Sequence, residues 1–347
     1  MSQKPVNGLI AIAVLCMFGA VANGQDRPTE VTALRPYVPS VRDLARYSTP
    51  SPIDEWEWML TCQASYYANP STFIDIAFWA DSRYRDDLVI SLHQTGVATG
   101  MRRWGFNKVE MFYDRTFLTD TRGFIAYSDD TVVVSFSGSE FSDGFVDWWG
   151  TDANVLLVDG SDYGVAGRVH MGFAMSAETV YAQILARVDA ASKAGKRVLI
   201  TGHSLGGAVA TLTASRLERD GVDVAALYAF ANPLVGDAEF CLDLASSGIT
   251  CVRTYNHLDP VPRYPINLSV IPYLASLVRD YVHVPSMEVY FDSEMNAVLC
   301  PSQERLEDEL YFLTAVDPRA HDTALYLLLT YANLSSQAIA VVPTPDI

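Results

Sequence analysis

One hexapeptide, Gly202–Gly207 (GHSLGG), limits the possible folds of this 347-residue chain more than any other segment. The apolar run Val198–Ile200 before it is typical of a buried strand, and the Ala- and Leu-rich residues Leu205–Arg216 after it predict a helix. A G-x-S-x-G pattern in this context requires a tight turn, because side chains at the glycine positions would clash. The turn lifts Ser204 above the sheet edge at a helix N-terminus, which favours negative charge. We interpret Ser204 as a nucleophile; a purely structural turn is the alternative.

Segments of strand character alternate with helical segments through most of the chain. Strands are expected at about 108–113, 124–127, 131–136, 197–201, 224–230, 250–256 and within 281–291, and helices at about 51–68, 73–92, 174–194, 205–216 and 320–334. This alternation indicates a mostly parallel sheet flanked by helices on both faces. Because no linker divides the series of strands, we predict a single α/β domain.

The first 24 residues have the layout of a secretory signal peptide. Lys4 precedes an apolar run from Leu9 to Val21, and small residues follow at positions 22–24. A membrane anchor is the alternative, but the run has 13 residues and a spanning helix needs about 20. We expect a signal peptide at 1–24, a Pro-rich arm at 25–52 and the α/β domain at 53–347. The protein would then be secreted, with no stable transmembrane segment after cleavage.

The charge balance excludes one kind of partner. Asp and Glu number 41 against 24 Lys and Arg, which gives a formal net charge of -17. Duplex DNA or an anionic lipid surface would be repelled, and no run of Lys and Arg offsets this charge. We therefore expect no nucleic-acid partner. Because no CxxC or HExxH spacing is present, we expect no metal, and the chemistry below needs no organic cofactor.

Four cysteines remain after the first 24 residues, and an even number in an exported chain suggests disulfide bonds. One short loop separates Cys241 from Cys251, so we favour this pair, which leaves Cys62 with Cys300. The alternative is four buried free thiols.

A serine nucleophile needs a base, and the base needs a carboxylate that orients it. In hydrolases with a strand–turn–helix serine, the order along the chain is serine, carboxylate, histidine. Of the three histidines that follow Ser204, His257 comes too early to leave room for a carboxylate before it. His283 lies in an alternating strand, where a structural histidine is more common. His321 begins a helix after a polar turn, so we select His321 over His283.

Asp259 is the candidate carboxylate. It follows the strand expected at 250–256, so it emerges at the C-terminal edge of the sheet, level with the serine. Neighbouring prolines stiffen its loop and fix where the carboxylate points. Asp223 precedes a strand and Asp237 stands where a helix starts, so each is more typical of a turn or a cap.

Six segments of the chain, taken in order, resemble the class 3 lipases, the fungal-type triacylglycerol lipases with the α/β-hydrolase fold. They are TVVVSFSGS (131–139), VHMGF (169–173), ITGHSLGG (200–207), FANPLVGD (230–237), NHLDPVP (256–262) and HDTALY (321–326). One such match would be modest evidence, whereas six in order are a specific signal. The resemblance implies an α/β-hydrolase domain.

The resemblance also implies a role for each site residue. It implies Ser204 as the nucleophile, Asp259 as the orienting carboxylate and His321 as the base, in agreement with the choice from the residues. It further implies an oxyanion hole formed by Ser139, through its backbone N–H and hydroxyl, and by the backbone N–H of Leu205. Each such donor contributes roughly 3 kcal/mol at the tetrahedral intermediate.

The sequence departs from the family pattern at two positions. Ser137 stands where the family usually has an arginine, and Leu234 stands where it often has another. Both changes leave the predicted triad intact, so we expect them to affect the substrate pocket more than the chemistry.

Residues 140–149 (EFSDGFVDWW) follow the predicted oxyanion serine, where the family has a lid helix over the site. Four aromatic residues among acidic ones fit an amphipathic flap that exposes its rings to lipid when open. We expect a moving lid with Gly144 as a hinge; the alternative is that Trp148 and Trp149 are core anchors.

The resemblance implies a secreted serine hydrolase of carboxylic esters, a triacylglycerol lipase that acts on neutral lipid esters at an oil–water interface through an acyl-Ser204 intermediate. Phospholipase A1 or feruloyl esterase activity is the alternative on the same fold, and the negative charge argues against anionic phospholipid. A non-catalytic binding module would be indicated by a missing triad residue, and none is missing.

Overall fold

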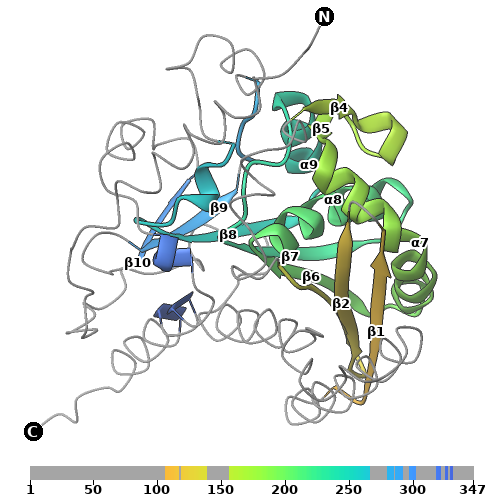
Figure 1. Ribbon diagram of the computed structural model, residues 1–347. Helices are drawn as coiled ribbons and strands as arrows, with labels where there is room; N and C mark the ends of the chain where they lie inside the picture. Colours follow the sequence, from red (N-terminus) through yellow and green to blue (C-terminus); the bar gives the residue numbers. More distant parts are fainter. Residues whose placement is uncertain are drawn as a thin grey trace, which may run out of the picture.

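The computed structural model describes residues 106–116, 119–138, 156–265, 280–284, 286–291, 297–301, 318–321, 325–326 and 329–330 (Figure 1). Their main element is an eight-stranded sheet in the order β1-β2-β3-β6-β7-β8-β9-β10. The strands are β1 (Lys108–Arg115), β2 (Asp120–Tyr127), β3 (Thr131–Phe136), β6 (Arg197–His203), β7 (Val224–Phe230), β8 (Thr250–Asn256), β9 (Met287–Phe291) and β10 (Ala297–Pro301). The strands from β3 to β9 in this order pair in parallel, whereas the pairs β1–β2, β2–β3 and β9–β10 are antiparallel. The predicted mostly parallel sheet is confirmed.

Helices of the described part cover one face of this sheet (Figure 1). They are α7 (Met171–Lys193), α8 (Leu205–Arg219) and α9 (Ala238–Ser246). The remaining elements are a two-stranded sheet of β4 (Leu157–Asp159) and β5 (Arg168–His170), and the 3-10 helices η4 (Gly160–Tyr163), η5 (Val261–Arg263) and η9 (Pro318–His321). None of the helices described here has the length and apolar character that a bilayer span requires.

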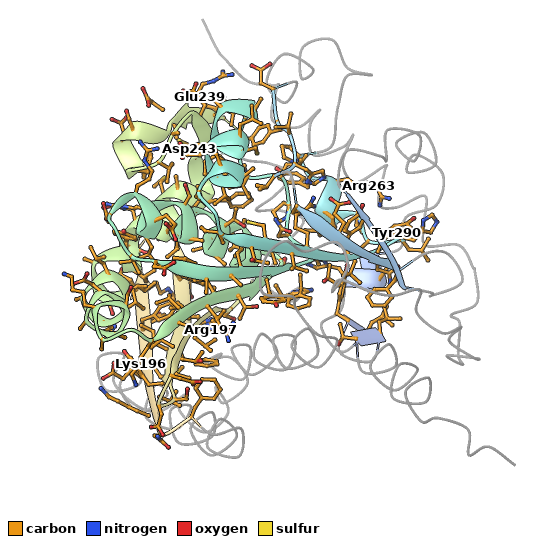
Figure 2. All side chains as sticks on the ribbon, turned by 180° about the vertical axis from the view of Figure 1, so that it is seen from behind. Lys196, Arg197, Glu239, Asp243, Arg263 and Tyr290 are labelled. Carbon is orange, nitrogen blue, oxygen red and sulfur yellow. The ribbon has the colours of Figure 1, made fainter. Side chains whose placement is uncertain are left out.

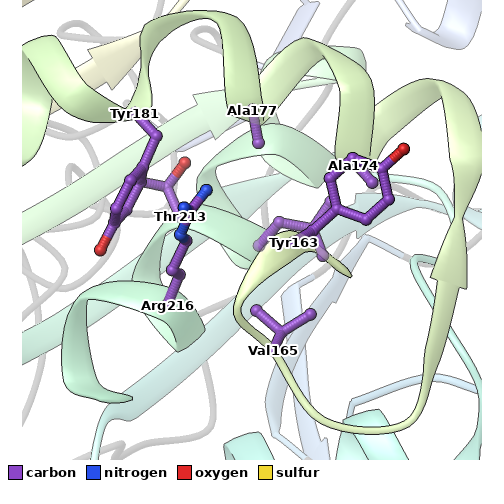
Figure 3. A pocket seen from close by; sticks show the side chains of 8 residues that line it. Tyr163, Val165, Ala174, Ala177, Tyr181, Thr213 and Arg216 are labelled. Atoms are coloured by element: carbon purple, nitrogen blue, oxygen red, sulfur yellow. The ribbon is translucent and has the colours of Figure 1, made fainter. Parts of the chain in front are cut away.

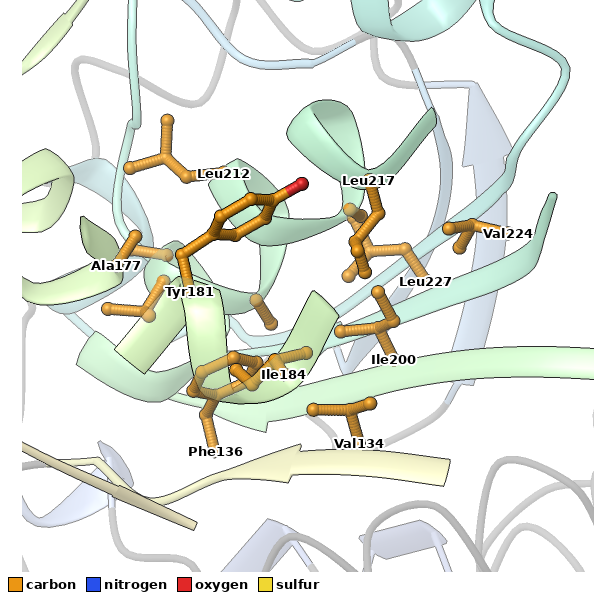
Figure 4. Close-up of a cluster of buried hydrophobic side chains, with 14 of the residues drawn as sticks. Val134, Phe136, Ala177, Tyr181, Ile184, Ile200, Leu212, Leu217, Val224 and Leu227 are labelled. Carbon is orange, nitrogen blue, oxygen red and sulfur yellow. The ribbon is translucent and has the colours of Figure 1, made fainter. Parts of the chain in front are cut away.

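Both faces of the sheet carry a buried core, which explains the continuous apolar runs in its central strands. On one face, Ile200 of β6 packs in a cluster with Ile184 of α7 and Leu212 of α8 (Figure 4). On the other face, Leu199 packs in a cluster that includes Tyr326 from the C-terminal segment. Neighbouring residues of β6 thus face opposite sides, as strand geometry requires.

Several element boundaries differ from those predicted from sequence; β2, for example, begins at Asp120 rather than at about residue 124. Helix α7 begins at Met171 rather than at about residue 174, because His170 caps it: the Nδ1 atom accepts the N–H of Phe173 over 3.3 Å. The strand expected within 281–291 is present only as β9, and Val282 forms an isolated bridge to Gly236 instead. The predicted signal peptide, the arm and the helices at 51–68 and 73–92 lie outside the described residues.

The predicted disulfide between Cys241 and Cys251 is wrong, because both thiols are free. Cys241 is on the buried side of α9, with its Sγ 3.5 Å from the carbonyl oxygen of Val282, and Cys251 packs against the same core from β8. Burial raises the pKa of each thiol to about 12, so neither is present as the reactive thiolate. Cys62 and the side chain of Cys300 lie outside the described part of the chain.

Candidate active site

Ser204 lies at a sharp turn between β6 and α8. Its φ is 58° and its ψ is -129°, a strained conformation for a residue other than glycine. The N–H of Ser204 donates to the carbonyl oxygen of Phe230 over 2.9 Å, so the sheet holds the turn in place. A Cβ on Gly202 would lie 2.3 Å from the Gly206 backbone, and a Cβ on Gly206 would lie 2.5 Å from the carbonyl oxygen of Phe136. These close approaches are the physical reason for both glycines.

Asp259 and His321 form a buried pair between the loop after β8 and η9. Asp259 Oδ2 lies 2.8 Å from His321 Nδ1, and the two side chains are 0% and 2% exposed. The hydroxyl of Tyr326 donates to the same Oδ2 over 2.8 Å, and the N–H of Val261 donates to Oδ1 over 2.9 Å. An ionised carboxylate only accepts, so His321 Nδ1 is the third donor, and the position of the carboxylate is fixed from three sides.

Tyr326 belongs to the site although the sequence analysis gave it no role. Its hydroxyl donates to Asp259 and accepts the N–H of Asn256 over 2.8 Å. Burial, and then the charge of Asp259, raise the pKa of Tyr326 well above its usual value, so the hydroxyl keeps its proton. The only sequence signal was the position of this tyrosine in the same HDTALY segment as His321.

His321 lies beside the Ser204 turn. Its ring centroid is 4.6 Å from that of His203, the residue directly before Ser204. Ser204 is 1% exposed, and its hydroxyl makes no hydrogen bond with the described residues. Hydrogen bonds of catalytic groups are often long before substrate binds, so this arrangement is compatible with proton transfer between Ser204 and His321.

The loop that carries Asp259 is held by Arg263. The Nη1 atom of Arg263 donates to the carbonyl oxygens of His257 and Asp259, each over 3.1 Å. His257 Nδ1 lies 2.6 Å from the hydroxyl of Tyr290 in β9, and Arg263 and Tyr290 lie at the same end of the sheet (Figure 2). His257 therefore contacts β9, whereas His321 contacts Asp259.

Asp237 and His283, the alternatives to Asp259 and His321, lie in environments typical of structural residues. Asp237 caps α9, because its Oδ1 accepts the N–H of Phe240 over 3.1 Å, and it pairs with Arg168 at 3.0 Å. This confirms the interpretation of Asp237 as a cap. Burial, and then the charges of nearby arginines, hold the pKa of His283 well below its usual range. His283 is therefore a neutral imidazole at ordinary pH.

One of the two predicted oxyanion donors can be placed. Leu205 is the first residue of α8, where a backbone N–H has no acceptor within the helix. Ser139 lies outside the described residues, and so does the predicted lid at 140–149.

A small cavity lies on the helical side of the sheet (Figure 3). Its volume of about 10 Å³ is the space that one water molecule needs. It is lined by Tyr163, Val165, Ala174, Ala177, Tyr181, Leu212, Thr213 and Arg216. A cavity that holds at most one water molecule has no room for an acyl chain, so this cavity is not the substrate pocket. Within the described ranges, no three His, Cys, Asp or Glu side chains gather as a metal site.

A parallel sheet, a strained serine between a strand and a helix, and a carboxylate–histidine pair beside it define an α/β hydrolase. Residues 133–269 match the family described as "Lipase (class 3)". A Penicillium cyclopium protein named "Secreted mono- and diacylglycerol lipase A" is 31% identical over 268 residues, which are 74% of this chain and 76% of that protein. The chain therefore belongs to the class 3 lipase family, and it is a carboxylic ester hydrolase.

Other relatives agree with this assignment. A Rhizomucor miehei protein named "Lipase" is 33% identical over 159 residues, 43% of this chain and 42% of that protein. The crystal structure of a variant of MDLA from Penicillium cyclopium has a TM-score of 0.55 and 26% identity, and covers 82% of this chain and 99% of that one. The structure of Rhizomucor miehei triacylglyceride lipase has a TM-score of 0.56 and 22% identity, and covers 81% of this chain and 99% of that one. These structures share the α/β-hydrolase fold.

Proposed function

We propose that the protein is a secreted triacylglycerol lipase in which Ser204 is the nucleophile, His321 the base and Asp259 the carboxylate that orients it. The observation that carries the proposal is the buried 2.8 Å contact of His321 with Asp259 beside the strained Ser204 turn. A carboxylate on Nδ1 fixes the tautomer and leaves Nε2 as the basic atom.

In the first half of the reaction, His321 Nε2 takes the Ser204 proton while Oγ attacks the ester carbonyl. The tetrahedral intermediate places a negative charge on the former carbonyl oxygen, and the N–H groups of Leu205 and Ser139 are the proposed donors to it. His321 then gives its proton to the leaving alcohol, and acyl-Ser204 remains. In the second half, His321 activates water, which hydrolyses the acyl-enzyme and releases the fatty acid.

Neutral lipid esters are the substrate class that the charge favours. The net charge of -17 opposes anionic phospholipid surfaces, so an acylglycerol droplet is a better partner than an anionic membrane. The aromatic segment 140–149 would open at such an oil–water interface as a lid. Relatives named mono- and diacylglycerol lipases support partial glycerides as a second substrate of the same site. Phospholipids and feruloyl esters are the remaining alternatives.

The secreted location of a relative supports export of this chain, with residues 1–24 as signal peptide and 25–52 as an arm ahead of the catalytic domain. N-terminal sequencing of the protein from the medium of a secreting host tests this. We expect a sequence that starts at Gln25; a chain retained on membranes with Met1 present would contradict it.

The experiment that tests the activity is hydrolysis of a short-chain triglyceride, followed from below to above its solubility limit, with Ser204→Ala as the control. We expect a Ser204-dependent rate that rises sharply once droplets form. Saturation below the limit, without a rise, would indicate an esterase without an interfacial lid. A rate that does not depend on Ser204 would overturn the assignment of the nucleophile.

A further inference from the structure

His203 connects the nucleophile turn to the segment that carries His321. It is the last residue of β6 and is 2% exposed. Its ring centroid lies 4.6 Å from that of His321 with the planes 37° apart, and 5.4 Å from that of Tyr326 in an edge contact. His203 also forms a hydrogen bond with the backbone of His321. We call His203, His321 and Tyr326 the ring cluster.

The backbone of His203 is held by the central sheet. His203 pairs with Phe230 in the register of β6 and β7, and the next N–H, that of Ser204, donates to the carbonyl oxygen of Phe230. Side chains alternate along a strand, so His203 shares a face with Leu199, which packs in the same core as Tyr326. The His321 ring therefore rests on a side chain whose position is set by a central strand.

We propose that His203 is a positioning residue for His321: its ring packs against the imidazole and its hydrogen bond holds the His321 backbone, so that the imidazole stays between Asp259 and Ser204. The inference rests on the proposed function, because His203 acts only through the proposed base. A structural histidine that merely fills the core would affect stability and leave the turnover of the folded enzyme unchanged.

The charges around the ring cluster agree with this role. Burial, and then the charge of His321, hold the pKa of His203 well below its usual range, although the hydrogen bond to the His321 backbone opposes this. The other titratable groups at the cluster are Tyr326, whose pKa is raised, and Asp259, which pairs with His321. His321 becomes a cation when it accepts the Ser204 proton. A neutral His203 does not repel that cation, whereas a second charged ring would.

Three substitutions of His203 separate the contribution of its ring to turnover from that of its hydrogen bond. His203→Ala removes both, His203→Phe keeps a ring, and His203→Asn keeps a side-chain N–H. Steady-state kinetics with soluble p-nitrophenyl butyrate avoids any contribution from an interface. We expect His203→Ala to lower kcat by roughly 10- to 100-fold with little change in KM, because a misplacement of about 1 Å is enough for such a loss. His203→Phe and His203→Asn should each recover part of the loss.

The matched control is His170→Asn, which alters another histidine that is 2% exposed but lies outside the ring cluster. We expect its kcat to equal that of the wild type. An unchanged kcat in folded His203→Ala, or an equal loss in His170→Asn, would overturn the inference. If His203→Ala does not fold, the other two variants decide: a wild-type kcat in both His203→Phe and His203→Asn would also overturn the inference. A wild type with no Ser204-dependent esterase activity would instead overturn the proposed function.

Discussion

Asp259 accepts hydrogen bonds from three separate parts of the chain: His321 at the end of η9, the hydroxyl of Tyr326 and the backbone of Val261. Because the carboxylate is 0% exposed, water does not replace a donor that is removed. At the scale of single residues, the orientation of His321 therefore depends on the donors around Asp259 as well as on Asp259 itself.

Tyr326→Phe tests this dependence. The substitution removes the hydroxyl that donates to Asp259 and keeps the ring, which is fully buried. One hydrogen bond to a charged group is worth about 1.5–3 kcal/mol, so we expect kcat for a soluble ester to fall roughly 10- to 100-fold with KM nearly constant. Steady-state kinetics of the purified variant measures this.

Tyr290→Phe is the matched control, because its hydroxyl lies 2.6 Å from His257 Nδ1 rather than at Asp259. We expect its kcat to change much less. If the two variants lose activity equally, the loss comes from general loosening of the strand ends and not from the donor to Asp259.

At the scale of elements, β8 and β9 are joined by a buried ion pair. Arg253 and Glu288 stand opposite each other in the register, with Nη1 and Oε1 2.7 Å apart and side chains 5% and 2% exposed. Tyr255 donates to the other carboxylate oxygen over 2.9 Å, and Asn232 accepts from Arg253 Nε over 3.2 Å. The guanidinium of Arg253 thus lies beside residues 231–234 (ANPL). In this segment, Leu234 occupies the position where the family often has an arginine.

Arg253→Met leaves Glu288 buried without its cation. We expect the free energy of unfolding to fall by about 3–5 kcal/mol, because the penalty of an unpaired buried charge remains. The double variant Arg253→Met/Glu288→Leu should recover much of this loss. Urea denaturation of the single and double variants measures both effects, and a double variant less stable than Arg253→Met would contradict the explanation.

Helix α7 depends on an unusual cap. His170 Nδ1 accepts the N–H of Phe173, and the ring stacks on that of Phe173 with the centroids 3.8 Å apart. Burial lowers the pKa of His170 to about 3, against about 6.5 in an unfolded chain. Protonation of Nδ1 would remove the acceptor, so the folded state requires the neutral ring.

His170→Asn removes the titration and keeps an acceptor at the cap. The unfolded chain binds more protons between the two pKa values, so the stability contributed by His170 is complete above pH 6.5 and is lost as the pH falls towards 3. Between pH 7 and pH 4.5 the wild type should lose roughly 2–3 kcal/mol more than the variant. Chemical denaturation at the two pH values measures the difference; equal losses would contradict the role of His170.

At the scale of the whole molecule, the features that the sequence predicted are those that depend on local pattern and chain order. The Ser204 turn follows from glycine spacing, and the parallel sheet follows from the alternation of strands and helices. The order of Ser204, Asp259 and His321 selected two residues that the structure places 2.8 Å apart, and their catalytic roles stay predictions.

The features that the sequence did not predict depend on tertiary contacts. The start of α7 was missed because histidine is not a common cap. The place of Tyr326 in the site was missed because its hydrogen bond to Asp259 joins positions that are 67 residues apart in the sequence. The Cys241–Cys251 disulfide was wrongly favoured because closeness along the chain does not fix the geometry that a disulfide needs. The lid and the signal peptide lie outside the described residues and stay predictions.

The central claim, that Ser204 is a nucleophile activated by His321, is tested most directly by covalent labelling. The full chain is treated with a fluorophosphonate probe, and the modified peptide is identified by mass spectrometry, with Ser204→Ala and His321→Ala beside the wild type. We expect one adduct on Ser204, none in Ser204→Ala and a greatly slowed reaction in His321→Ala. Labelling at another serine, or an undiminished rate in His321→Ala, would contradict the account.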